Sequence, residues 1–349
     1  MKTSLMRDMM NGATRLMFPG GADERPLQRR FRNMLAFGSG LRKALPAVVR
    51  KSSAQFLAGT YCNAAGSLDY KVFIPSGYRG RPLPLVVMLH GCKQDPDDFA
   101  AGTRMNELAE EWQCLVVYPA QTKRGNGLRC WNWFNAVNQQ RDQGEPSMIA
   151  GITGDVLHTF NGDRRRVYIA GLSAGGAMAV IMGTTYPELY AAVGVHSGLA
   201  YAGASDLYSA IIAMRSGAPS ALQPDDPDAA ALAGERVMST IVFHGDMDTT
   251  VHPENGNLVL AQSASNLVDG ALLQANEASV EHGQIAGGHA FTRTIHADAA
   301  GQSVAELWLV HGAAHAWSGG SAGASYTDPK GPDASREMLR FFFSQAQRR

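Results

Sequence analysis

A serine within the pattern Gly-x-Ser-x-Gly is the clearest chemical signal in the sequence. Ser173 lies in the run GLSAG at residues 171–175. This run follows RVYIA at residues 166–170, a short β-prone segment, and precedes GAMAVIM at residues 176–182, which permits a helix. A tight turn between strand and helix holds a nucleophilic serine in a strained conformation, and glycines around it avoid collisions. The context therefore predicts that Ser173 is a nucleophile.

Carboxylates and an imidazole follow Ser173 along the chain, in the order that a serine hydrolase uses. The apolar run TIVFH at residues 240–244 leads into a loop with Asp246 and Asp248, and a later apolar strand leads into a loop with His315. A serine hydroxyl needs an imidazole to accept its proton, and the imidazole needs a carboxylate to fix its tautomer. Loops after parallel strands are where such groups gather.

More than one residue could fill each of these two roles. Asp246 lies closer to the strand end than Asp248, which favours a turn-capping role for Asp246. The candidates for the base are His315, His311, His252 and His244. His311 stands directly at a strand end, where a core or turn role is also expected. From spacing alone, both choices stay open.

The oxyanion that forms during acyl transfer needs backbone N–H donors. One donor is the amide after the nucleophile, here Ala174. The second comes from the loop after an earlier strand, expected at residues 85–89 and followed by the turn HGC at residues 90–92. We assign the Cys92 N–H as this second donor, with Gly91 as the alternative.

Taken together, these motifs resemble the polyhydroxyalkanoate (poly-3-hydroxybutyrate) depolymerase family of esterases, which also includes feruloyl and acetylxylan esterases. The shared motifs are LHGC at residues 89–92, CWNWF at 130–134, GLSAGG at 171–176, HGDMD at 244–248 and HAWSGG at 315–320. The likeness runs from about Gly59 to Phe343. It implies an α/β-hydrolase fold and ester hydrolysis by a Ser-His-Asp triad through an acyl-enzyme, with no cofactor.

The resemblance also implies roles that spacing leaves open. The family pattern Gly-x-x-Asp-x-x-Val places the acid at Asp248, and the His-Ala-Trp motif places the base at His315. The family pairs the turn cysteine with the one before the Trp-Asn-Trp motif, which makes Cys92–Cys130 the candidate disulfide. Cys114 begins an apolar strand and is expected to be a buried free thiol. Four cysteines allow three full pairings, so the sequence alone does not choose one.

Aromatic residues beside these motifs are candidates for the substrate groove. Trp131 and Trp317 suit stacking on an acyl chain or a polymer segment, whereas Trp133 and Phe134 suit filling space behind the site. A polymer or oligomer of 3-hydroxybutyrate is the substrate that the resemblance implies, and feruloyl or acetylxylan esters are the alternative.

Binding to solid polymer is a property in which this sequence departs from some family members. Family members that attack solid polymer commonly carry a further binding domain, and this sequence ends at Arg349, soon after its last predicted helix. We therefore keep short or soluble esters among the expected substrates.

Two other classes of protein fit the sequence less well. A serine peptidase of this fold would usually add a large cap or a propeller domain. A granule-binding protein without catalysis would not need Ser173, Asp248 and His315 in register.

Length and composition narrow the classes of protein to which this chain could belong. A chain of 349 residues with 45% hydrophobic content is ordinary for a globular enzyme. The formal net charge of zero gives no indication of a nucleic-acid partner. No apolar run is long enough to predict a transmembrane segment, and no zinc-ligand spacing occurs, so no metal is expected. We expect a catalytic domain at residues 56–349 after an N-terminal extension at residues 1–55.

The N-terminal extension is strongly basic. Residues 1–51 carry eleven Lys and Arg against three Asp and Glu, which favours a solvated arm over one that contacts an anionic surface or a granule. Arg29-Arg30 resembles part of a twin-arginine signal, but Arg42-Lys43 interrupts the following segment. The resemblance and the candidate disulfide favour an extracellular or periplasmic location, whereas the missing signal peptide favours the cytoplasm.

Strands and helices alternate along the predicted catalytic domain. Strands are expected at residues 68–74, 85–89, 114–118, 166–170, 191–195, 239–243, 290–297 and 303–310. Helices are expected near residues 98–112, 147–160, 175–185, 255–267 and 333–346. This alternation predicts a mostly parallel sheet with helices on both faces, and the last two strands form a hairpin. Residues 219–236 are expected to be a surface loop or a small cap.

Overall fold

The computed structural model describes residues 53–217, 238–269 and 278–347. The expected N-terminal extension lies outside these residues except for its last three positions, of which Gln55 already belongs to the first strand. The loop or cap expected at residues 219–236 also lies outside the described residues. Within the described part of the chain, no helix is long and apolar enough to cross a membrane.

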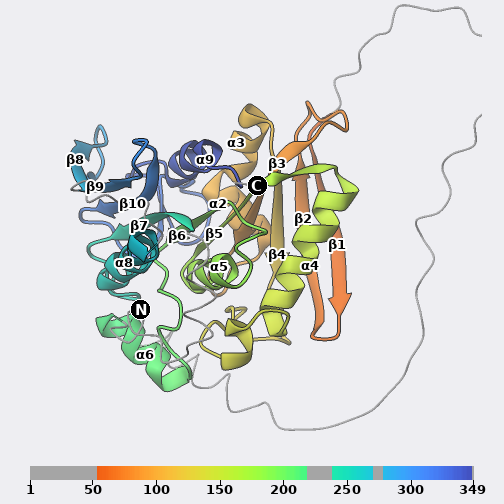
Figure 1. Ribbon diagram of the computed structural model, residues 1–349, viewed down its shortest axis with the longest axis horizontal. Coiled ribbons are helices and arrows are strands. Elements are labelled where there is room, and N and C mark those ends of the chain that lie inside the picture. The colour runs from red at the N-terminus through yellow and green to blue at the C-terminus, as the bar shows by residue number, and fades with distance from the viewer. Residues whose placement is uncertain (1–52, 218–237, 270–277, 348–349) are drawn as a thin grey trace, which may run out of the picture.

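A mixed sheet forms the centre of the described structure (Figure 1). Its ten strands lie in the order β1-β2-β4-β3-β5-β6-β7-β10-β9-β8. They are β1 (Gln55–Asn63), β2 (Gly66–Ile74), β3 (Leu83–Leu89), β4 (Leu115–Ala120), β5 (Gly162–Leu172), β6 (Ala192–His196), β7 (Ser239–Gly245), β8 (Ser279–Gln284), β9 (Ala290–Ala297) and β10 (Ser303–Val310). The strands from β4 to β10 in this order run parallel, and antiparallel strands extend the sheet at both edges.

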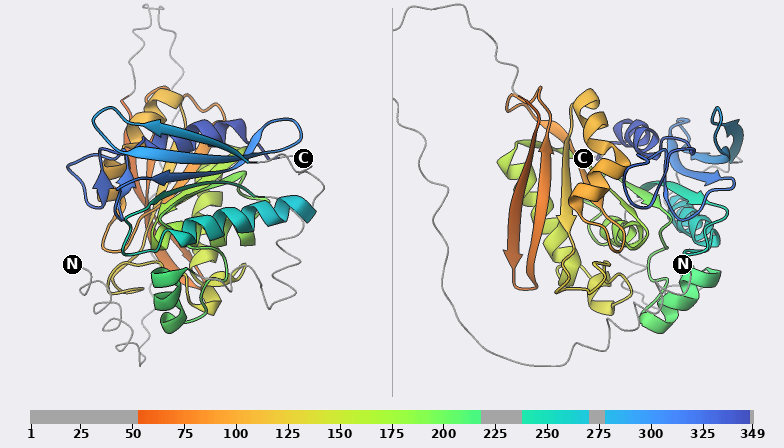
Figure 2. Two further views of the ribbon diagram at one scale, coloured as in Figure 1. Left: turned by 90° about the vertical axis from the view of Figure 1, so that its left-hand side faces the viewer. Right: turned by 180° about the vertical axis from the view of Figure 1, so that it is seen from behind.

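Helices cover both faces of the sheet (Figure 2). One face carries α2 (Pro96–Thr103), α3 (Met105–Trp112) and α9 (Ala334–Ser344), and the other carries α4 (Gly144–Thr159), α5 (Ala174–Thr185) and α8 (Glu254–Asp269). The short helices η1 (Ala136–Gln139) and α6 (Leu207–Ser216) lie in connections that follow β4 and β6. A small second sheet pairs β11 (Trp317–Ser318) with β12 (Thr327–Asp328).

Two hydrophobic cores result from these layers, one on each side of the sheet. Ile149, Met178 and Val259 belong to the core under α4, α5 and α8, whereas Phe99 and Phe342 belong to the opposite core. Every residue of β3, with the sequence LPLVVML, is buried. Strands buried on both faces need such continuous apolar runs, which is why the central strands were visible in the sequence.

The predicted α/β class is confirmed, and each expected strand and helix is present: β9 and β10 have the expected bounds, and the others have shifted ends. The helix expected at residues 98–112 is two helices, because Arg104 takes a left-handed conformation with φ of 56° between them. Among the described residues, six elements were not predicted: the edge strands β1 and β8, the short strands β11 and β12, and the helices η1 and α6. β1 and β8 are largely exposed, so they lack the continuous apolar run that marks a buried strand.

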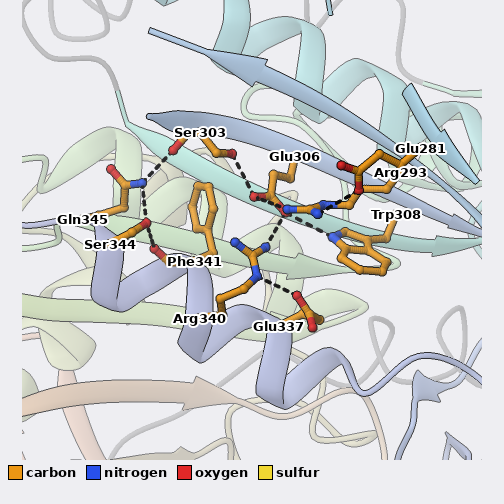
Figure 3. Close-up of polar contacts among 10 residues, drawn as sticks. All are labelled: Glu281, Arg293, Ser303, Glu306, Trp308, Glu337, Arg340, Phe341, Ser344 and Gln345. Carbon is orange, nitrogen blue, oxygen red and sulfur yellow. Dashed lines mark hydrogen bonds and ion pairs between the residues drawn. The ribbon is translucent and has the colours of Figure 1, made fainter. Parts of the chain in front are cut away.

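A buried carboxylate ties the C-terminal helix to the hairpin of β9 and β10 (Figure 3). Glu306 accepts hydrogen bonds from Arg293 at 3.0 and 3.1 Å, from Arg340 at 2.7 Å, from Ser303 at 2.8 Å and from the Trp308 indole at 3.2 Å. Burial alone would raise the pKa of Glu306, but these two guanidinium groups hold it below the ordinary value. The network therefore fixes β10, the strand that leads to the loop of His315.

The parallel strands direct all the sequence-predicted site residues to one edge of the sheet. β3, β5, β7 and β10 end just before the turn of Cys92, Ser173, the loop of Asp248 and the loop of His315, respectively. Because the carboxyl ends of parallel strands meet at the same edge, these loops converge there.

Candidate active site

Ser173 occupies the sharp turn between β5 and α5. Its φ of 58° and ψ of −121° lie in a region that non-glycine residues rarely adopt, which makes this a strained position. A Cβ on Gly171 would lie 2.2 Å from the carbonyl oxygen of Gly175, so the turn requires glycine there. Ser173 is partly exposed, whereas Ala174 after it is buried.

The Ser173 turn packs directly against the end of β3. A Cβ on Gly175 would lie 2.1 Å from the carbonyl oxygen of Leu89, and one on Gly91 would lie 3.5 Å from the carbonyl oxygen of Leu172. The close approach at Gly175 brings the end of β3, and with it the turn at residues 90–92, beside the serine turn. Gly175 thus allows two backbones to meet, whereas a Cβ on Gly91 would make only an ordinary contact with the Leu172 carbonyl.

Asp248 and His315 form a hydrogen-bonded pair. The distance from His315 Nδ1 to Asp248 Oδ2 is 2.6 Å. The other carboxylate oxygen, Oδ1, accepts hydrogen bonds from the backbone N–H groups of Thr250 and Val251 at 2.8 and 2.9 Å. The Asp248 side chain is fully buried and that of His315 is 10% exposed. The carboxylate is therefore held from one side and faces the imidazole on the other.

The environment of Asp248 favours its charged form. Burial alone would raise its pKa, but hydrogen bonds from His244 and His315 bring the pKa well below the ordinary value for aspartate. An ionised Asp248 accepts a hydrogen bond from the N–H at His315 Nδ1. The lone pair on Nε2 is then available to take a proton from a hydroxyl group.

The alternative pair, Asp246 and His311, lies on the same two loops but has other partners. His311 Nδ1 is 2.9 Å from Asp246 Oδ2, and its Nε2 is 2.8 Å from Thr292 Oγ1. Asp246 Oδ1 accepts a hydrogen bond from Gly312 N–H at 2.7 Å. This pair therefore joins the β7 loop to β9 and to the start of the His315 loop.

The two remaining histidine candidates have other hydrogen-bond partners. His252 is exposed, and its Nδ1 accepts a hydrogen bond from Glu254 N–H at 3.2 Å. His244 is fully buried, with Nε2 2.9 Å from the Val251 carbonyl and 3.5 Å from Asp248 Oδ2. Within the described residues, Ser173 Oγ and His315 form no hydrogen bond with each other. Such contacts often tighten only when substrate binds.

The backbone amides around Ser173 differ in their availability. The Gly91 N–H already donates to Gln94 Oε1 at 3.0 Å. In the described part of the chain, the N–H groups of Cys92 and Ala174 have no protein acceptor. Of the two expected candidates for the second oxyanion donor, the arrangement therefore favours Cys92 over Gly91.

A disulfide links Cys92 to Cys130, as predicted, with a Cα–Cα distance of 4.2 Å. This distance is slightly below the usual range of about 4.4–6.8 Å. Cys114 is a buried free thiol, also as predicted, and burial raises its pKa to about 12. A backbone hydrogen bond of 2.7 Å from Lys93 N–H to Leu128 O runs beside the disulfide. The turn of Cys92 is thus tied to the loop of Cys130 twice.

The structure gives Trp131 and Trp317 a different position from the groove wall expected from the sequence. Both side chains are buried, with 0% and 1% exposure. The Trp131 indole N–H donates to the His90 carbonyl at 3.0 Å, and that of Trp317 donates to Ser335 Oγ at 3.1 Å. Because each ring and its one polar atom have interior partners, this arrangement favours a supporting role beneath the site.

Sequence reasoning missed two buried polar residues that hold the site loops, Gln94 and His196, and it named the buried His244 only as a candidate base. Gln94 joins the Cys92 turn to Ser325 through its side-chain amide at 3.1 Å. The two histidines end or nearly end β6 and β7. A histidine at the end of an apolar strand was the available signal. Among the described residues, no cluster of three His, Cys, Asp or Glu side chains could hold a metal ion.

Comparisons with known proteins show the family of the chain. A family model described as "Esterase PHB depolymerase" matches residues 68–277, more than half of the chain. Poly(3-hydroxyalkanoate) depolymerase C of Paucimonas lemoignei is 32% identical over 235 residues, which cover 64% of this chain and 56% of that protein. Acetylxylan esterase A of Talaromyces purpureogenus is 29% identical over 229 residues, covering 59% and 55%. The chain thus spans about half the length of the curated relatives it matches.

Solved structures show the same fold. An acetyl xylan esterase from Aspergillus awamori superimposes with a TM-score of 0.58 at 18% identity, over 84% of this chain and 99% of that one. This similarity, together with the mostly parallel sheet, shows the fold, which is that of the α/β-hydrolases. Together with the family match, it leads to one conclusion: the chain belongs to the esterase PHB depolymerase family.

Proposed function

We propose that this protein is a serine esterase that hydrolyses carboxylic esters through Ser173, His315 and Asp248. The observation that carries the proposal is the 2.6 Å pair of buried Asp248 and His315, on loops that converge with the strained Ser173 turn. The proposal also has the support of the family match, because the named relatives include a depolymerase and an acetylxylan esterase.

In the first half of the reaction, Ser173 Oγ attacks the carbonyl carbon of the ester. His315 Nε2 accepts the hydroxyl proton, and ionised Asp248 stabilises the resulting imidazolium through Nδ1–H. The developing oxyanion accepts hydrogen bonds from the N–H groups of Cys92 and Ala174. His315 then gives the proton to the leaving alcohol, and an acyl-enzyme on Ser173 remains.

In the second half, water replaces the alcohol. His315 takes a proton from the water as it attacks the acyl carbon, the same two N–H groups hold the second oxyanion, and the proton returns to Ser173 Oγ as the acid leaves. The disulfide supports both halves, because it holds the turn that supplies the Cys92 N–H. Each step uses only groups of this chain and water.

As substrate class we propose polymers or oligomers of 3-hydroxybutyrate and related hydroxyacids. The support is the poly(3-hydroxyalkanoate) depolymerase that matches with 32% identity. The second candidate is a feruloyl or acetylxylan esterase. It has the support of the acetylxylan esterase relative and of the superimposed acetyl xylan esterase fold. The disulfide also supports an oxidising compartment, outside the cytoplasm.

A substrate panel with the full chain tests these proposals. The panel contains p-nitrophenyl butyrate, 3-hydroxybutyrate oligomers, solid polymer, methyl ferulate and acetylated xylan. Ser173→Ala should remove ester hydrolysis, with a fall in kcat of roughly 10⁴-fold or more, while the thermal midpoint stays the same. A fluorophosphonate should label Ser173 of the unaltered protein, as peptide mass spectrometry would show. Polymer binding without turnover or labelling would instead indicate a non-enzymatic granule-binding protein.

A further inference from the structure

We propose that His196 is a positioning residue that fixes the Ser173 turn and the His315 loop relative to each other. This inference rests on the esterase function proposed above and concerns the same site. His196 is the last residue of β6, which lies between β5 and β7 in the sheet. In the parallel register it lies beside Leu172 on one side and Phe243 on the other.

The main chain of His196 holds the serine turn. Its carbonyl oxygen accepts a hydrogen bond from the Ser173 N–H at 2.9 Å. Ser173 has a strained backbone, and this bond is one of the contacts that maintain the strain. The position of the nucleophile therefore depends directly on the end of β6.

The side chain of the same residue holds the other loop. His196 Nε2 accepts a hydrogen bond from the backbone N–H of Ser318 at 2.9 Å, and Nδ1 faces Ser197 Oγ at 3.3 Å. Ser318 is buried and lies three residues after His315. The ring must therefore carry its proton on Nδ1 and keep Nε2 as an acceptor.

The ring itself is fixed by its neighbours. It stacks on Trp317, with ring centres 5.1 Å apart and an interplanar angle of 27°, and on Phe243, at 5.9 Å and 16°. Trp317 is in turn anchored by its hydrogen bond to Ser335. Burial, together with the nearby His244 and His315, lowers the pKa of His196 to about 3, so the acceptor persists at neutral pH.

One residue thus contacts both loops, through its main chain on one side and its side chain on the other. Loss of the acceptor would leave the buried Ser318 N–H without a partner and remove one of the contacts that hold the loop after His315. A displacement of about 1 Å of a reacting group can lower a rate by roughly 100-fold. His196 touches no substrate in this scheme, so it acts through Ser173 and His315.

Three substitutions separate this role from simple packing. His196→Gln places an amide oxygen near the position of Nε2, whereas the shorter His196→Asn reaches only the position of Nδ1. Phe243→Leu is the matched control, because it removes stacking on the same ring but leaves the acceptor in place. We would measure kcat and KM for p-nitrophenyl butyrate, the rate of fluorophosphonate labelling, and the thermal midpoint.

We expect His196→Asn to lower kcat and the labelling rate by about 30- to 100-fold, with KM changed less than about threefold. His196→Gln should recover kcat to within about fivefold of the unaltered protein, and Phe243→Leu should stay within about threefold even though its thermal midpoint falls. Equal kcat for the Asn and Gln variants, or a loss in Phe243→Leu as large as in His196→Asn, would overturn the proposal.

The outcome for the unaltered protein separates the two proposals. If it neither hydrolyses the ester nor reacts at Ser173, the proposed function itself fails. If it does both and His196→Asn retains its kcat, the esterase function stands and the positioning role of His196 is refuted.

Discussion

Two Asp–His pairs lie side by side on the loops after β7 and β10, and they differ in burial and in the third group of each pair. Asp246 and His311 are 33% and 39% exposed at the side chain, and Thr292 supplies the third group. Asp248 and His315 are 0% and 10% exposed, on loops that converge with the Ser173 turn. The spacing along the chain is almost equal, since 65 residues separate one pair and 67 the other.

Burial and backbone hydrogen bonds set the proposed catalytic pair of Asp248 and His315 apart from the other pair. A hydrogen bond from imidazole to carboxylate is present in both pairs, so the bond itself does not distinguish them. Burial strengthens electrostatic interactions at Asp248, and two backbone N–H groups hold its second oxygen. The second carboxylate oxygen of Asp246 instead accepts a hydrogen bond from the Gly312 N–H, which fixes the start of the loop that carries His315.

The largest difference between the pairs should appear on substitution of the carboxylates. Asp248→Asn should lower kcat by about 10⁴-fold, because the amide no longer stabilises the imidazolium or the correct tautomer. Asp246→Asn is the matched variant and should lower kcat by less than about tenfold, with its main effect on stability. Steady-state kinetics on p-nitrophenyl butyrate would check both. The reverse order would transfer the proposed acid to Asp246.

A further feature of the proposed site is covalent support, which the disulfide gives to the Cys92 turn beside Ser173. Replacing Cys92 and Cys130 together by serine should cost about 2–4 kcal/mol of unfolding free energy for a loop of 38 residues. The kcat should fall by roughly ten- to 100-fold, because the Cys92 N–H loses its fixed position. Cys62→Ser, at an exposed free cysteine, is the control and should change neither quantity. Unchanged kcat in the double variant would argue against Cys92 as an oxyanion donor.

Acid should lower the free energy of unfolding, because His196 binds a proton more readily in the unfolded chain than in the folded protein. Its folded-state pKa of about 3 is below the unfolded value of about 6.5, so only the unfolded chain binds a proton between these values. Stability is therefore lost as pH falls below about 6.5, by about 1.4 kcal/mol per pH unit, or about 2 kcal/mol at pH 5. Urea unfolding of the unaltered protein and of His196→Gln at pH 7 and pH 5 would measure this loss of unfolding free energy. The Gln variant should lose about 2 kcal/mol less, and equal losses would contradict the shifted pKa.

The smallest effect is expected at the third member of the exposed pair. Thr292→Val removes the hydroxyl that bonds His311 Nε2 and should cost about 1 kcal/mol of unfolding free energy or less. Its kcat should stay within about twofold of the unaltered protein, because Asp248 and His315 keep their contacts. Chemical denaturation and ester kinetics on the same preparation would test this. A loss of kcat greater than tenfold would mean that the two pairs act together.

Much of the fold and of the candidate site could be predicted because the decisive signals are local. The apolar runs of the central strands, the glycines around Ser173 and the turn after β3 all lie within short segments. The exposed strands β1 and β8 were missed because they lack such runs. Gln94 and His196 were missed because their partners, Ser325 and Ser318, are more than 100 residues away along the chain.

The positions of the two tryptophans also could not be predicted from local sequence signals. Trp131 and Trp317 stand next to site motifs, and their size suits a substrate groove, yet both side chains pack inside with their N–H groups satisfied. Sequence proximity to a motif places the backbone near the site. Sequence proximity does not determine whether a side chain points toward the site or into the interior.

Local signals are enough to predict the α/β class, the strained serine turn and the order of Ser173, Asp248 and His315, because strand periodicity and glycine sterics act over a few residues. Which carboxylate meets which histidine depends on how the loops pack in the folded protein. Asp246 and Asp248 differ by two positions, and their partners depend on how β7 and β10 align. The parallel register sets Gly245 beside Val310, and the two loops that leave these residues then pack so that one pair is buried and the other exposed.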